Sequence, residues 1–274
     1  KLKGGFVVAS ETCALDHIGA DFIRDVEPGE AVIIDDQGLR TLYKRTSNLR
    51  QASCVFEHIY FARPDSVLDG RLVYSSRMEM GKELAREHPV EADMVIGVPD
   101  SATAAAVGYS QESGIPYGEG LVKNRYVGRT FILPDQRLRE LGVRTKLNPL
   151  PELIKDKKLV VVEDSIVRGT TSPPVVNILR KGGAKEVHFR ICAPPIMHPC
   201  QLGIDMPTKE ELIAANKTVD DIRKSIGADS LGYLSHSGLV KAVNLDRDRI
   251  CMACFTGDHP IPVQLELDKL ALEA

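Results

Sequence analysis

The sequence predicts an α/β protein in which helices flank a parallel sheet. Segments 93–114 and 159–183 each combine an apolar strand, a loop of small residues and a helix, and 186–191 is a further apolar strand. Strands that alternate with helices in this way lie parallel and are joined by right-handed crossovers. Ligands of such sheets bind beyond the carboxyl ends of the strands, so the two loops are expected to face one crevice.

Segment 159–171 carries the clearest functional signal in the chain. It opens with a β-branched run, Val160 to Val162, typical of a strand buried on both faces. The acidic pair Glu163 and Asp164 follows. A loop of small hydroxyl residues and one glycine comes next: Ser165, Gly169, Thr170 and Thr171. The residues after this loop predict a helix that begins at a Pro-Pro pair and ends at a Gly-Gly pair.

This arrangement puts hydroxyl and backbone N–H groups at a helix N-terminus, where the partial positive charge favours a phosphate. Glu163 and Asp164 suit ribose hydroxyls or a divalent cation. For the loop alone, an ordinary strand–helix turn with a Ser/Thr cap is the alternative. The adjoining acidic pair favours the phosphate site.

The N-terminal segment 1–45 has too little apolar surface for a stable domain of its own. Its predicted elements are a short strand at 6–9, turns at 11–16 and 25–29, and a hairpin of 31–34 with 39–43. After it, residues 76–88 predict a helix with Met80, Leu84 and Ala85 on one face, and Pro89 ends this helix.

The first strand–loop–helix unit consists of a strand at 94–98, a loop at 99–103 and a helix that Gly114 ends. The stretch 124–150 then is basic and poor in apolar residues. Two interpretations stay open from its composition: a solvated charged surface, or a cationic lid over a pyrophosphate site.

The C-terminal third predicts a stiff proline-rich loop and further helices. Thr208 and Glu211 have the spacing of a capping box at a helix start. The other elements expected here are a strand at 186–191, the loop 193–200, a polar helix ended by Gly227, a strand at 230–234 and a helical turn from 237.

Composition excludes several classes of function. The chain has 35 basic and 38 acidic residues and a net charge of −3, so it has no electrostatic footprint for nucleic acid or for an anionic membrane. No apolar run approaches the roughly 20 residues that span a bilayer, and the start does not have the pattern of a signal peptide. A cytoplasmic protein is expected.

Six cysteines are too few and too scattered for a disulfide scaffold, so they are expected to be thiols or ligands. Cys251 and Cys254 form a C-x-x-C pair, which is the usual two-ligand half of a metal or iron–sulfur site. On its own the pair leaves zinc, a cluster, a redox pair and chance spacing open.

Segment 163–171 resembles the phosphoribosyl-pyrophosphate (PRPP) motif of type I phosphoribosyltransferases, and in particular that of the amidophosphoribosyltransferase family. Further segments resemble that family in the same order: 54–66, 97–101, 123–131 and 251–254. The resemblance runs from about residue 5 to 260, nearly the whole chain. It implies a type I phosphoribosyltransferase-like parallel sheet flanked by helices, preceded by a β remnant of an N-terminal-nucleophile glutaminase domain.

The same resemblance implies three regions: a glutaminase remnant at 1–45, a phosphoribosyltransferase domain at 46–262 and a tail at 263–274. The implied reaction forms 5-phosphoribosylamine from PRPP and ammonia, which glutamine supplies in the complete enzyme, as the first step of purine biosynthesis. Because the chain begins with Lys1 rather than a nucleophilic cysteine, the glutaminase half-reaction is not expected from this chain alone.

By resemblance, Lys123, Arg125 and Arg129 are the catalytic cations, and Ser101, Glu163 and Asp164 hold Mg²⁺. The implied PRPP-binding residues are Asp100, Ser101, Glu163, Asp164, Ser165, Ile166, Val167, Arg168, Gly169, Thr170 and Thr171. The sequence departs from the family pattern at Glu163, where aspartate is usual, and at Ala102 and Ala104, where glycine and proline are usual.

Members of the family that carry a [4Fe–4S] cluster have cysteines in four contexts, which this sequence matches at Cys54, Cys200, Cys251 and Cys254. The resemblance thus implies a structural [4Fe–4S] cluster, with Cys13 and Cys192 left as buried thiols. His198 is expected to be a loop histidine rather than a zinc ligand.

The implied partners are PRPP, ammonia or glutamine, purine nucleotides as feedback inhibitors, further copies of the chain in a homo-oligomer, and a separate glutaminase chain. Two alternatives remain: a purine-salvage phosphoribosyltransferase, which adds a base instead of ammonia, and a non-catalytic regulator that binds PRPP.

Overall fold

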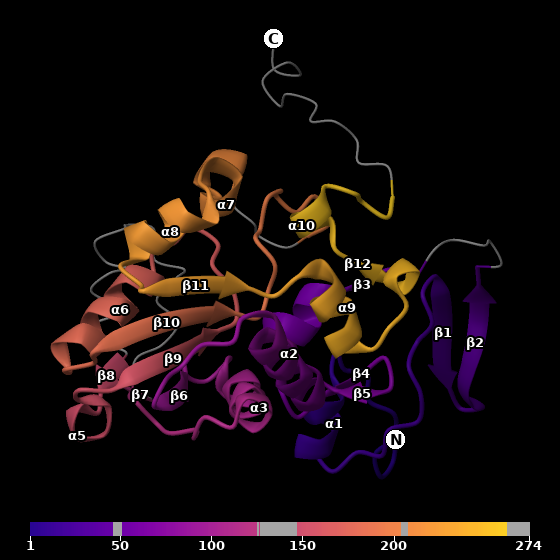
Figure 1. Ribbon diagram of the computed structural model, residues 1–274. Coiled ribbons are helices and arrows are strands. Elements are labelled where there is room, and N and C mark those ends of the chain that lie inside the picture. The colour runs from indigo at the N-terminus through magenta and orange to yellow at the C-terminus, as the bar shows by residue number, and fades with distance from the viewer. Residues whose placement is uncertain (46–50, 125, 127–146, 204–207, 262–274) are drawn as a thin grey trace.

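The computed structural model describes residues 1–45, 51–124, 126, 147–203 and 208–261. Its centre is a four-stranded sheet in the order β11-β10-β9-β6 (Figure 1). The strands are β6 (Met94–Gly97), β9 (Lys158–Glu163), β10 (Glu186–Ile191) and β11 (Ser230–Tyr233). All three neighbouring pairs are parallel, which confirms the predicted α/β class.

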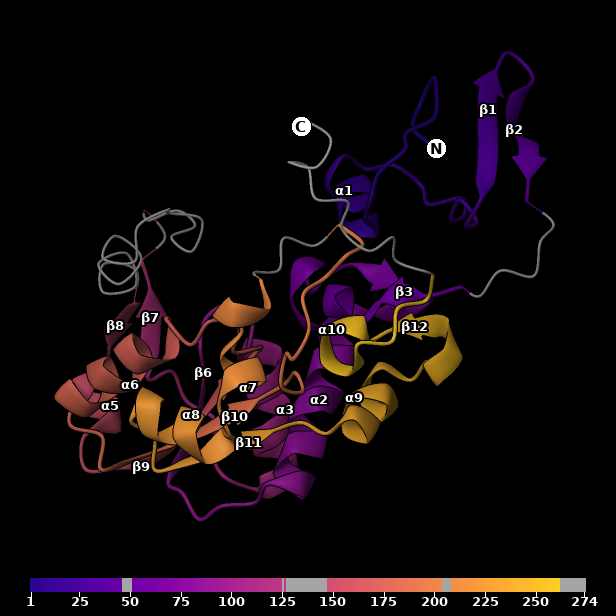
Figure 2. The same ribbon diagram turned by 90° about the horizontal axis from the view of Figure 1, so that it is seen from above.

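Helices cover both faces of this sheet (Figures 1 and 2). One face carries α6 (Ser172–Lys181) and α8 (Val219–Ile226). The other carries α2 (Val73–Glu87), α3 (Thr103–Ser113) and α9 (His236–Val243). The chain therefore forms three layers with the sheet in the middle.

Strand β9 alternates between two cores. Val160 and Val162 belong to the cluster that includes the α2 and α3 side chains, whereas Leu159 and Val161 belong to the cluster with α6 and α8. Each of these side chains is fully buried, which contributes on the order of 1.5–3 kcal/mol apiece. The prediction of a strand buried on both faces is confirmed.

Helices α2 and α3 touch backbone to backbone. A Cβ atom added at Gly81 would lie 1.8 Å from the Ala105 carbonyl oxygen, and one added at Gly108 would lie 1.9 Å from the Met78 carbonyl oxygen. These two glycines set the distance between the helices and so fix the position of α2 against the sheet.

Shorter elements surround the three layers. Before the basic stretch they are β3 (Ser53–Cys54), the π-helix η1 (Glu57–Phe61), β4 (Val67–Leu68), β5 (Arg71–Leu72) and β7 (Leu121–Lys123). After it they are β8 (Leu147–Pro149), α5 (Pro151–Ile154), η2 (Lys209–Glu211), α7 (Ile213–Asn216), η3 (Arg247–Arg249), β12 (Ile250–Cys251) and α10 (Ala253–Thr256).

The N-terminal segment consists of helix α1 (Thr12–His17) and the antiparallel hairpin of β1 (Glu30–Asp35) with β2 (Gly38–Lys44). The hairpin confirms its prediction. The strand predicted at 6–9 is wrong, because these residues join no ladder among the described residues.

The turn predicted at 11–16 is also wrong, because α1 forms there. Tertiary contacts explain the difference: the Glu11 carboxylate accepts the Arg63 N–H (2.8 Å) and the Ser66 hydroxyl (2.7 Å). The Thr12 hydroxyl accepts the Val67 N–H at 2.8 Å. These bonds dock the helix start onto the residues that precede α2.

The predicted capping box does not form. Residues 209–211 form a 3-10 turn, and the Thr208 side chain caps no backbone N–H. Glu211 instead accepts a hydrogen bond from the Arg168 guanidinium at 3.0 Å. The charge-assisted bond to Arg168 thus occupies the Glu211 carboxylate that a capping box would use.

No helix among the described residues is both long enough and apolar enough to cross a bilayer.

Candidate functional site

The two predicted loops meet at the carboxyl ends of β6 and β9. The Ser101 hydroxyl, from the loop after β6, donates to Asp164 Oδ2 at 2.5 Å. The Ser165 hydroxyl donates to Asp164 Oδ1 at 2.6 Å. Each carboxylate oxygen of Asp164 thus has one hydroxyl donor, and residues 63 positions apart share one site.

The acidic pair is nearly buried. Glu163 and Asp164 are each 8% exposed. Burial raises the pKa of Asp164, while the hydroxyls of Ser101 and Ser165 and the charge of Arg77 act in the opposite direction. The backbone carbonyls of the pair extend the sheet, since they accept the N–H groups of the two residues that follow β10.

Arg77 is a functional candidate that the sequence analysis missed. It lies on α2 and is 4% exposed. Its Nε donates to the His58 carbonyl (3.0 Å) and its Nη2 to the Ala62 carbonyl (2.7 Å), at the two ends of η1. The spacing offered a signal, because Arg77 lies three and seven residues before Met80 and Leu84 and so shares their buried face.

The loop 165–171 leads into the N-terminus of α6, as predicted. Ile166 is 2% exposed and belongs to the core, and Val167 packs against the other core cluster. These two residues can therefore offer a ligand only backbone groups. Gly169 has a φ of +71°, a left-handed conformation that favours glycine. Thr171 precedes the helix and is exposed.

Residues 211–213 brace this loop from outside. Arg168 is paired with Glu211, and the Ile213 N–H donates to the Val167 carbonyl at 3.0 Å. A side chain at Gly169 would meet Ile213 at 2.4 Å. The loop is therefore held in place without a ligand, and Arg168 is partly engaged by a carboxylate.

Lys123 and Asp100 form an ion pair at the mouth of the site. Lys123 ends β7, which pairs with β8 in a two-stranded antiparallel ladder. Asp100 follows a cis peptide bond after Pro99. The other two predicted catalytic cations, Arg125 and Arg129, lie outside the described residues.

The two residues at which the first loop departs from the family pattern pack at the start of α3. Ala102 is 1% and Ala104 3% exposed. A Cβ atom at Gly97 would already approach the Ala106 side chain at 3.1 Å. Small residues here allow α3 to lie close to the end of β6, which positions Ser101.

The four cysteines of the proposed cluster come from three elements, β3, β12 and α10, and from one loop. Cys54 and Cys251 are directly paired in the parallel ladder of β3 with β12. The Cys254 carbonyl accepts the N–H groups of Met197 (2.9 Å) and His198 (3.0 Å), which ties the loop that ends at Cys200 to α10.

The thiols lie in a common environment. All four are free, and each is half-buried. Burial, with smaller contributions from the neighbouring Cys251 and Cys200, raises the pKa of Cys54 to about 11. Burial is also the main cause of the raised pKa of Cys254, followed by the other three cysteines. In the described part of the chain, no three His, Cys, Asp or Glu side chains stand at metal-ligating positions. Cys13 and Cys192 are buried thiols, as expected.

The parallel sheet, the phosphate-type loop and the serine–aspartate contact define a type I phosphoribosyltransferase-like protein. No protein-family model matches the chain. Its sequence is 54% identical over its whole length to the amidophosphoribosyltransferase of Mycobacterium tuberculosis (strain H37Rv), of which it covers 53%. It is 55% identical to the enzyme of the same name from Archaeoglobus fulgidus, covering 96% of this chain and 58% of that protein.

Solved structures agree. A glutamine PRPP amidotransferase from B. subtilis, complexed with ADP and GMP, matches with a TM-score of 0.84 and 51% identity over 94% of this chain and 57% of that one. A second structure, described as the allosteric regulatory enzyme of purine biosynthesis, matches with a TM-score of 0.84, 52% identity, and coverage of 93% and 56%. Amidophosphoribosyltransferases are thus homologues of this chain, which spans about half the length of the curated relatives it matches.

Proposed function

We propose that the protein containing this chain is an amidophosphoribosyltransferase, a pentosyltransferase that forms 5-phosphoribosylamine from PRPP and ammonia derived from glutamine. The observation that carries the proposal is the contact between Ser101 and Asp164 in front of the loop 165–171. It brings a pyrophosphate-side loop and a ribose-phosphate loop into one site. The identity of 54% to relatives of that name supports it.

Different residues of this chain bind different parts of PRPP. The loop 165–171 holds the 5′-phosphate through its backbone and the hydroxyls of Ser165, Thr170 and Thr171, at the positive end of α6. Glu163 and Asp164 bind the ribose hydroxyls. Lys123 exchanges its partner Asp100 for the pyrophosphate, and Arg125 and Arg129 add positive charge there.

Mg²⁺ fits this site. Asp164 and Ser101 offer oxygen atoms already in contact, Glu163 is adjacent, and Mg²⁺ characteristically takes few protein oxygens together with substrate phosphates and water. When bound, the ion neutralises charge on the pyrophosphate. Glu163 stands where the family usually has aspartate. Its longer side chain is the difference from the family pattern that most affects Mg²⁺ binding.

In the reaction the bond from C1 to the pyrophosphate oxygen breaks, the bond from C1 to ammonia nitrogen forms, and the new ammonium group loses a proton to solvent. The transition state resembles an oxocarbenium ion. Neutral ammonia needs no strong base, so this chain's residues act by binding, by stabilising the leaving pyrophosphate and by excluding water.

The test uses ammonia as the nitrogen donor, which examines the PRPP site independently of any glutaminase. PRPP consumption that depends on ammonium and Mg²⁺ is expected, with release of one pyrophosphate per turnover. Consumption that depends on a purine base instead would indicate a salvage enzyme. PRPP binding without turnover would indicate the regulator.

We further propose that Cys54, Cys200, Cys251 and Cys254 hold a structural [4Fe–4S] cluster. The direct pairing of Cys54 with Cys251 and the tie between Cys254 and the loop before Cys200 support it. Anaerobic purification is expected to give a brown protein with iron and sulfide in equal amounts. Cys251→Ser abolishes the colour and Cys13→Ser retains it. A colourless wild-type protein that contains zinc contradicts the cluster.

The remaining proposals concern partners. The B. subtilis homologue was solved with ADP and GMP, which supports feedback inhibition by purine nucleotides here. Inhibition of the ammonia-dependent reaction by these two nucleotides tests it. A homo-oligomer, a glutaminase region beyond 1–45 on the same or a separate chain, and a cytoplasmic location remain predictions.

A further inference from the structure

Ile213, the first residue of α7, supports the loop 165–171 through two contacts. Its N–H donates to the Val167 carbonyl at 3.0 Å. Its side-chain Cδ1 lies only 2.4 Å from the position that a Cβ atom of Gly169 would take. One polar and one apolar contact from the same residue therefore hold the middle of the loop and the glycine at its left-handed turn.

The backbone around Ile213 is a break between two short helical pieces. The 3-10 turn η2 ends at Glu211, and Leu212 then is extended with a φ of −75° and a ψ of 111°. Helix α7 has only 4 residues, and a helix of that length is not stable on its own. A break of this kind also leaves carbonyls at the end of a turn without partners inside the helix. The position of Ile213 therefore depends on further bonds.

The side-chain amide of Asn216 supplies these bonds. Its Nδ2 donates to the carbonyls of Lys209 (3.1 Å), Glu210 (3.0 Å) and Leu212 (3.0 Å). An amide nitrogen has two hydrogens, so three acceptors share them. Asn216 lies at the end of α7, and its side chain thus ties this end to η2 and to the break between the two pieces.

Segment 208–216 and the loop 165–171 are anchored in the same two hydrophobic cores. Leu212 is fully buried in the cluster with the α2 and α3 side chains, and Ala214 is buried in the cluster with α6 and α8. In the loop, Val167 packs against the first cluster and Ile166 belongs to the second. A displacement of the segment would therefore disturb the packing of the loop on both sides of the sheet.

We propose that Asn216 is a positioning residue for the 5′-phosphate of PRPP. By holding η2 and α7 in one arrangement, its amide keeps Ile213 in contact with Val167 and Gly169, so that the loop presents its backbone N–H groups to the phosphate. Asn216 does not itself touch the substrate. The inference rests on the proposed function and adds a residue that acts on the phosphate loop but not on the pyrophosphate side of the site.

The experiment compares Asn216→Leu and Asn216→Ala with Thr218→Ala in the intact protein. Leucine keeps the approximate volume of asparagine without its donors, and none of the three substitutions changes a charge. Thr218 is the matched control, because it also makes local bonds to the backbone but lies outside the segment. Its hydroxyl caps α8 by accepting the Asp221 N–H at 3.2 Å.

Affinities for ribose 5-phosphate and for pyrophosphate with Mg²⁺ are measured by isothermal titration calorimetry. KM for PRPP and kcat are measured with ammonia, and Tm by calorimetry. Both Asn216 variants are expected to bind ribose 5-phosphate about tenfold more weakly and to raise KM for PRPP by about the same factor. Pyrophosphate affinity and kcat should stay within about twofold of wild type, because Asp100, Ser101 and Lys123 are untouched. Thr218→Ala should lower Tm and leave both affinities within about twofold.

Three results overturn the inference. Wild-type affinity for ribose 5-phosphate in both Asn216 variants would show that the loop does not need this side chain. Equal losses of ribose 5-phosphate and pyrophosphate affinity would show a general disturbance of the site. A loss in Thr218→Ala as large as in Asn216→Leu would show that any weakening of this surface has the same effect. A wild-type protein that binds neither PRPP nor ribose 5-phosphate refutes the proposed function, and the inference with it.

Discussion

Asp164 joins the two halves of the candidate site at the level of single atoms. Its two carboxylate oxygens accept hydroxyls from different loops, Ser101 and Ser165, while its backbone carbonyl continues the pairing of β9 with β10. A side chain placed in this way by the sheet has little freedom to lose when a ligand binds. Its neighbour Glu163 shares its burial but has the longer stem.

Asp164→Asn tests this role with almost no change in shape. The amide cannot carry the negative charge, so ammonia-dependent turnover of PRPP is expected to fall roughly 100-fold or more. Tm is expected to change little, because removal of a desolvated charge offsets the loss of an acceptor for one of the Ser101 and Ser165 hydroxyls. The matched control is Asp229→Asn, which weakens the bonds to Arg180 and to the Val187 N–H. It should lower Tm and leave kcat unchanged, and the opposite pattern would contradict the assignment.

His188, a buried histidine on β10, is a titratable group outside the candidate site. Its Nε2 lies 3.1 Å from Glu186, and its Nδ1 lies 3.0 Å from the Ser230 hydroxyl, whose oxygen also accepts from Arg190. Burial, aided by the charge of Arg190, lowers the pKa of His188 from 6.5. The folded state therefore favours the neutral ring, with Nδ1 as acceptor.

The sign of the pH effect follows. Below pH 6.5 the unfolded chain takes up a proton that the folded state resists, so the stability due to neutral His188 is present above this pH and is lost as pH falls. Urea unfolding at pH 7.5 and about pH 5.5 is expected to show a smaller loss in His188→Gln than in wild type. Identical losses would show that His188 does not contribute.

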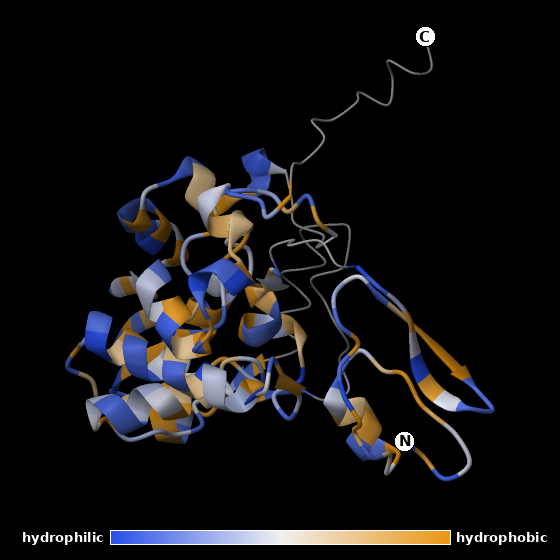
Figure 3. Ribbon diagram, turned by 90° about the vertical axis from the view of Figure 1, so that its right-hand side faces the viewer, coloured by the Kyte–Doolittle hydropathy of each residue, from blue (hydrophilic) through white to orange (hydrophobic). Residues whose placement is uncertain are grey.

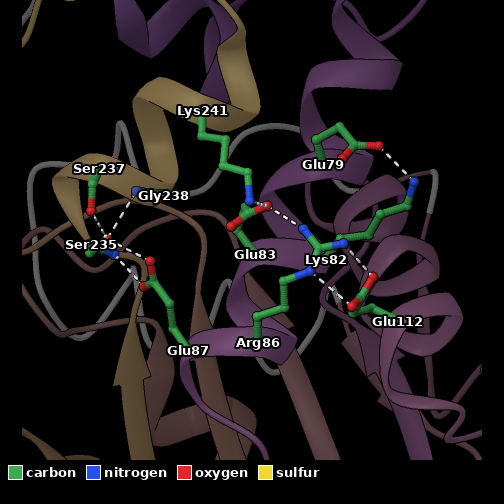
Figure 4. A network of polar contacts seen from close by, with 10 residues as sticks. All are labelled: Glu79, Lys82, Glu83, Arg86, Glu87, Glu112, Ser235, Ser237, Gly238 and Lys241. Atoms are coloured by element: carbon green, nitrogen blue, oxygen red, sulfur yellow. Dashed lines mark hydrogen bonds and ion pairs between the residues drawn. The ribbon is translucent and has the colours of Figure 1, made fainter.

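At the scale of elements, helix α2 links several parts of the described structure. It contacts α3 through the paired glycines, binds the carbonyls of His58 and Ala62 through Arg77, and holds α9 by a polar network (Figure 4). In that network Glu87 accepts the N–H of Ser235 at 2.7 Å and its hydroxyl at 2.5 Å. Glu83 forms an ion pair with Lys241 at 2.7 Å.

Glu87→Ala should loosen α9. It leaves the Ser235 N–H and hydroxyl without their acceptor, which costs about 1–3 kcal/mol of the free energy of unfolding. Hydrogen exchange in α9 is expected to accelerate at the same time. Glu79→Ala, which removes a surface pair with Lys82, is the control and should cost no more than about 0.5 kcal/mol. Equal costs for the two variants would show that the network does not hold α9.

Elements with a strong local pattern were predictable, and those that depend on distant partners were not. The apolar run of β9 and the glycine stops of α3 and α8 mark their elements from sequence alone. Helix α1 depends on the bonds of Glu11 to residues 63 and 66, more than 50 positions away. The capping box predicted at Thr208 does not form, because Glu211 binds Arg168, which is distant in sequence.

The same distinction applies to the site. The contact of Ser101 with Asp164 follows from parallel strands, whose carboxyl ends share one edge. Arg77 was not assigned, because an arginine in a helix is ordinarily solvated; its spacing to Met80 and Leu84 was the one sequence signal of burial, and its bond to the His58 carbonyl gives the reason. The cysteines were grouped by resemblance, and the ladder of β3 with β12 then placed two of them side by side.

Across the whole molecule, helices bury the hydrophobic residues of the central sheet, whereas many hydrophobic residues of the N-terminal segment are exposed. Figure 3 shows hydrophobic residues along the hairpin, which stands to one side of the body. Val8 is 72% and Leu42 70% exposed. That segment 1–45 is part of a larger region stays a prediction, and the Glu11 bonds show where that segment meets the body.

A last prediction concerns the basic stretch between β7 and β8. Replacing 125–146 with a short Gly-Ser linker is expected to leave Tm within a few degrees of wild type and to reduce PRPP turnover by roughly 100-fold, because Arg125 and Arg129 are lost. An Arg125→Ala/Arg129→Ala double variant with the stretch intact should reproduce the loss. Full activity in either protein would contradict the catalytic role of these arginines.

The pairing of Lys123 with Leu147 has a consequence for how this fold can change. The two ends of the stretch leave from facing positions of one ladder, so closing a longer or shorter stretch alters the chain entropy only slowly with length. Residues can be added or removed there without shifting the register of any strand. The mouth of the site can therefore diverge in evolution, or accept a grafted peptide, while the sheet that carries Asp164 stays unchanged.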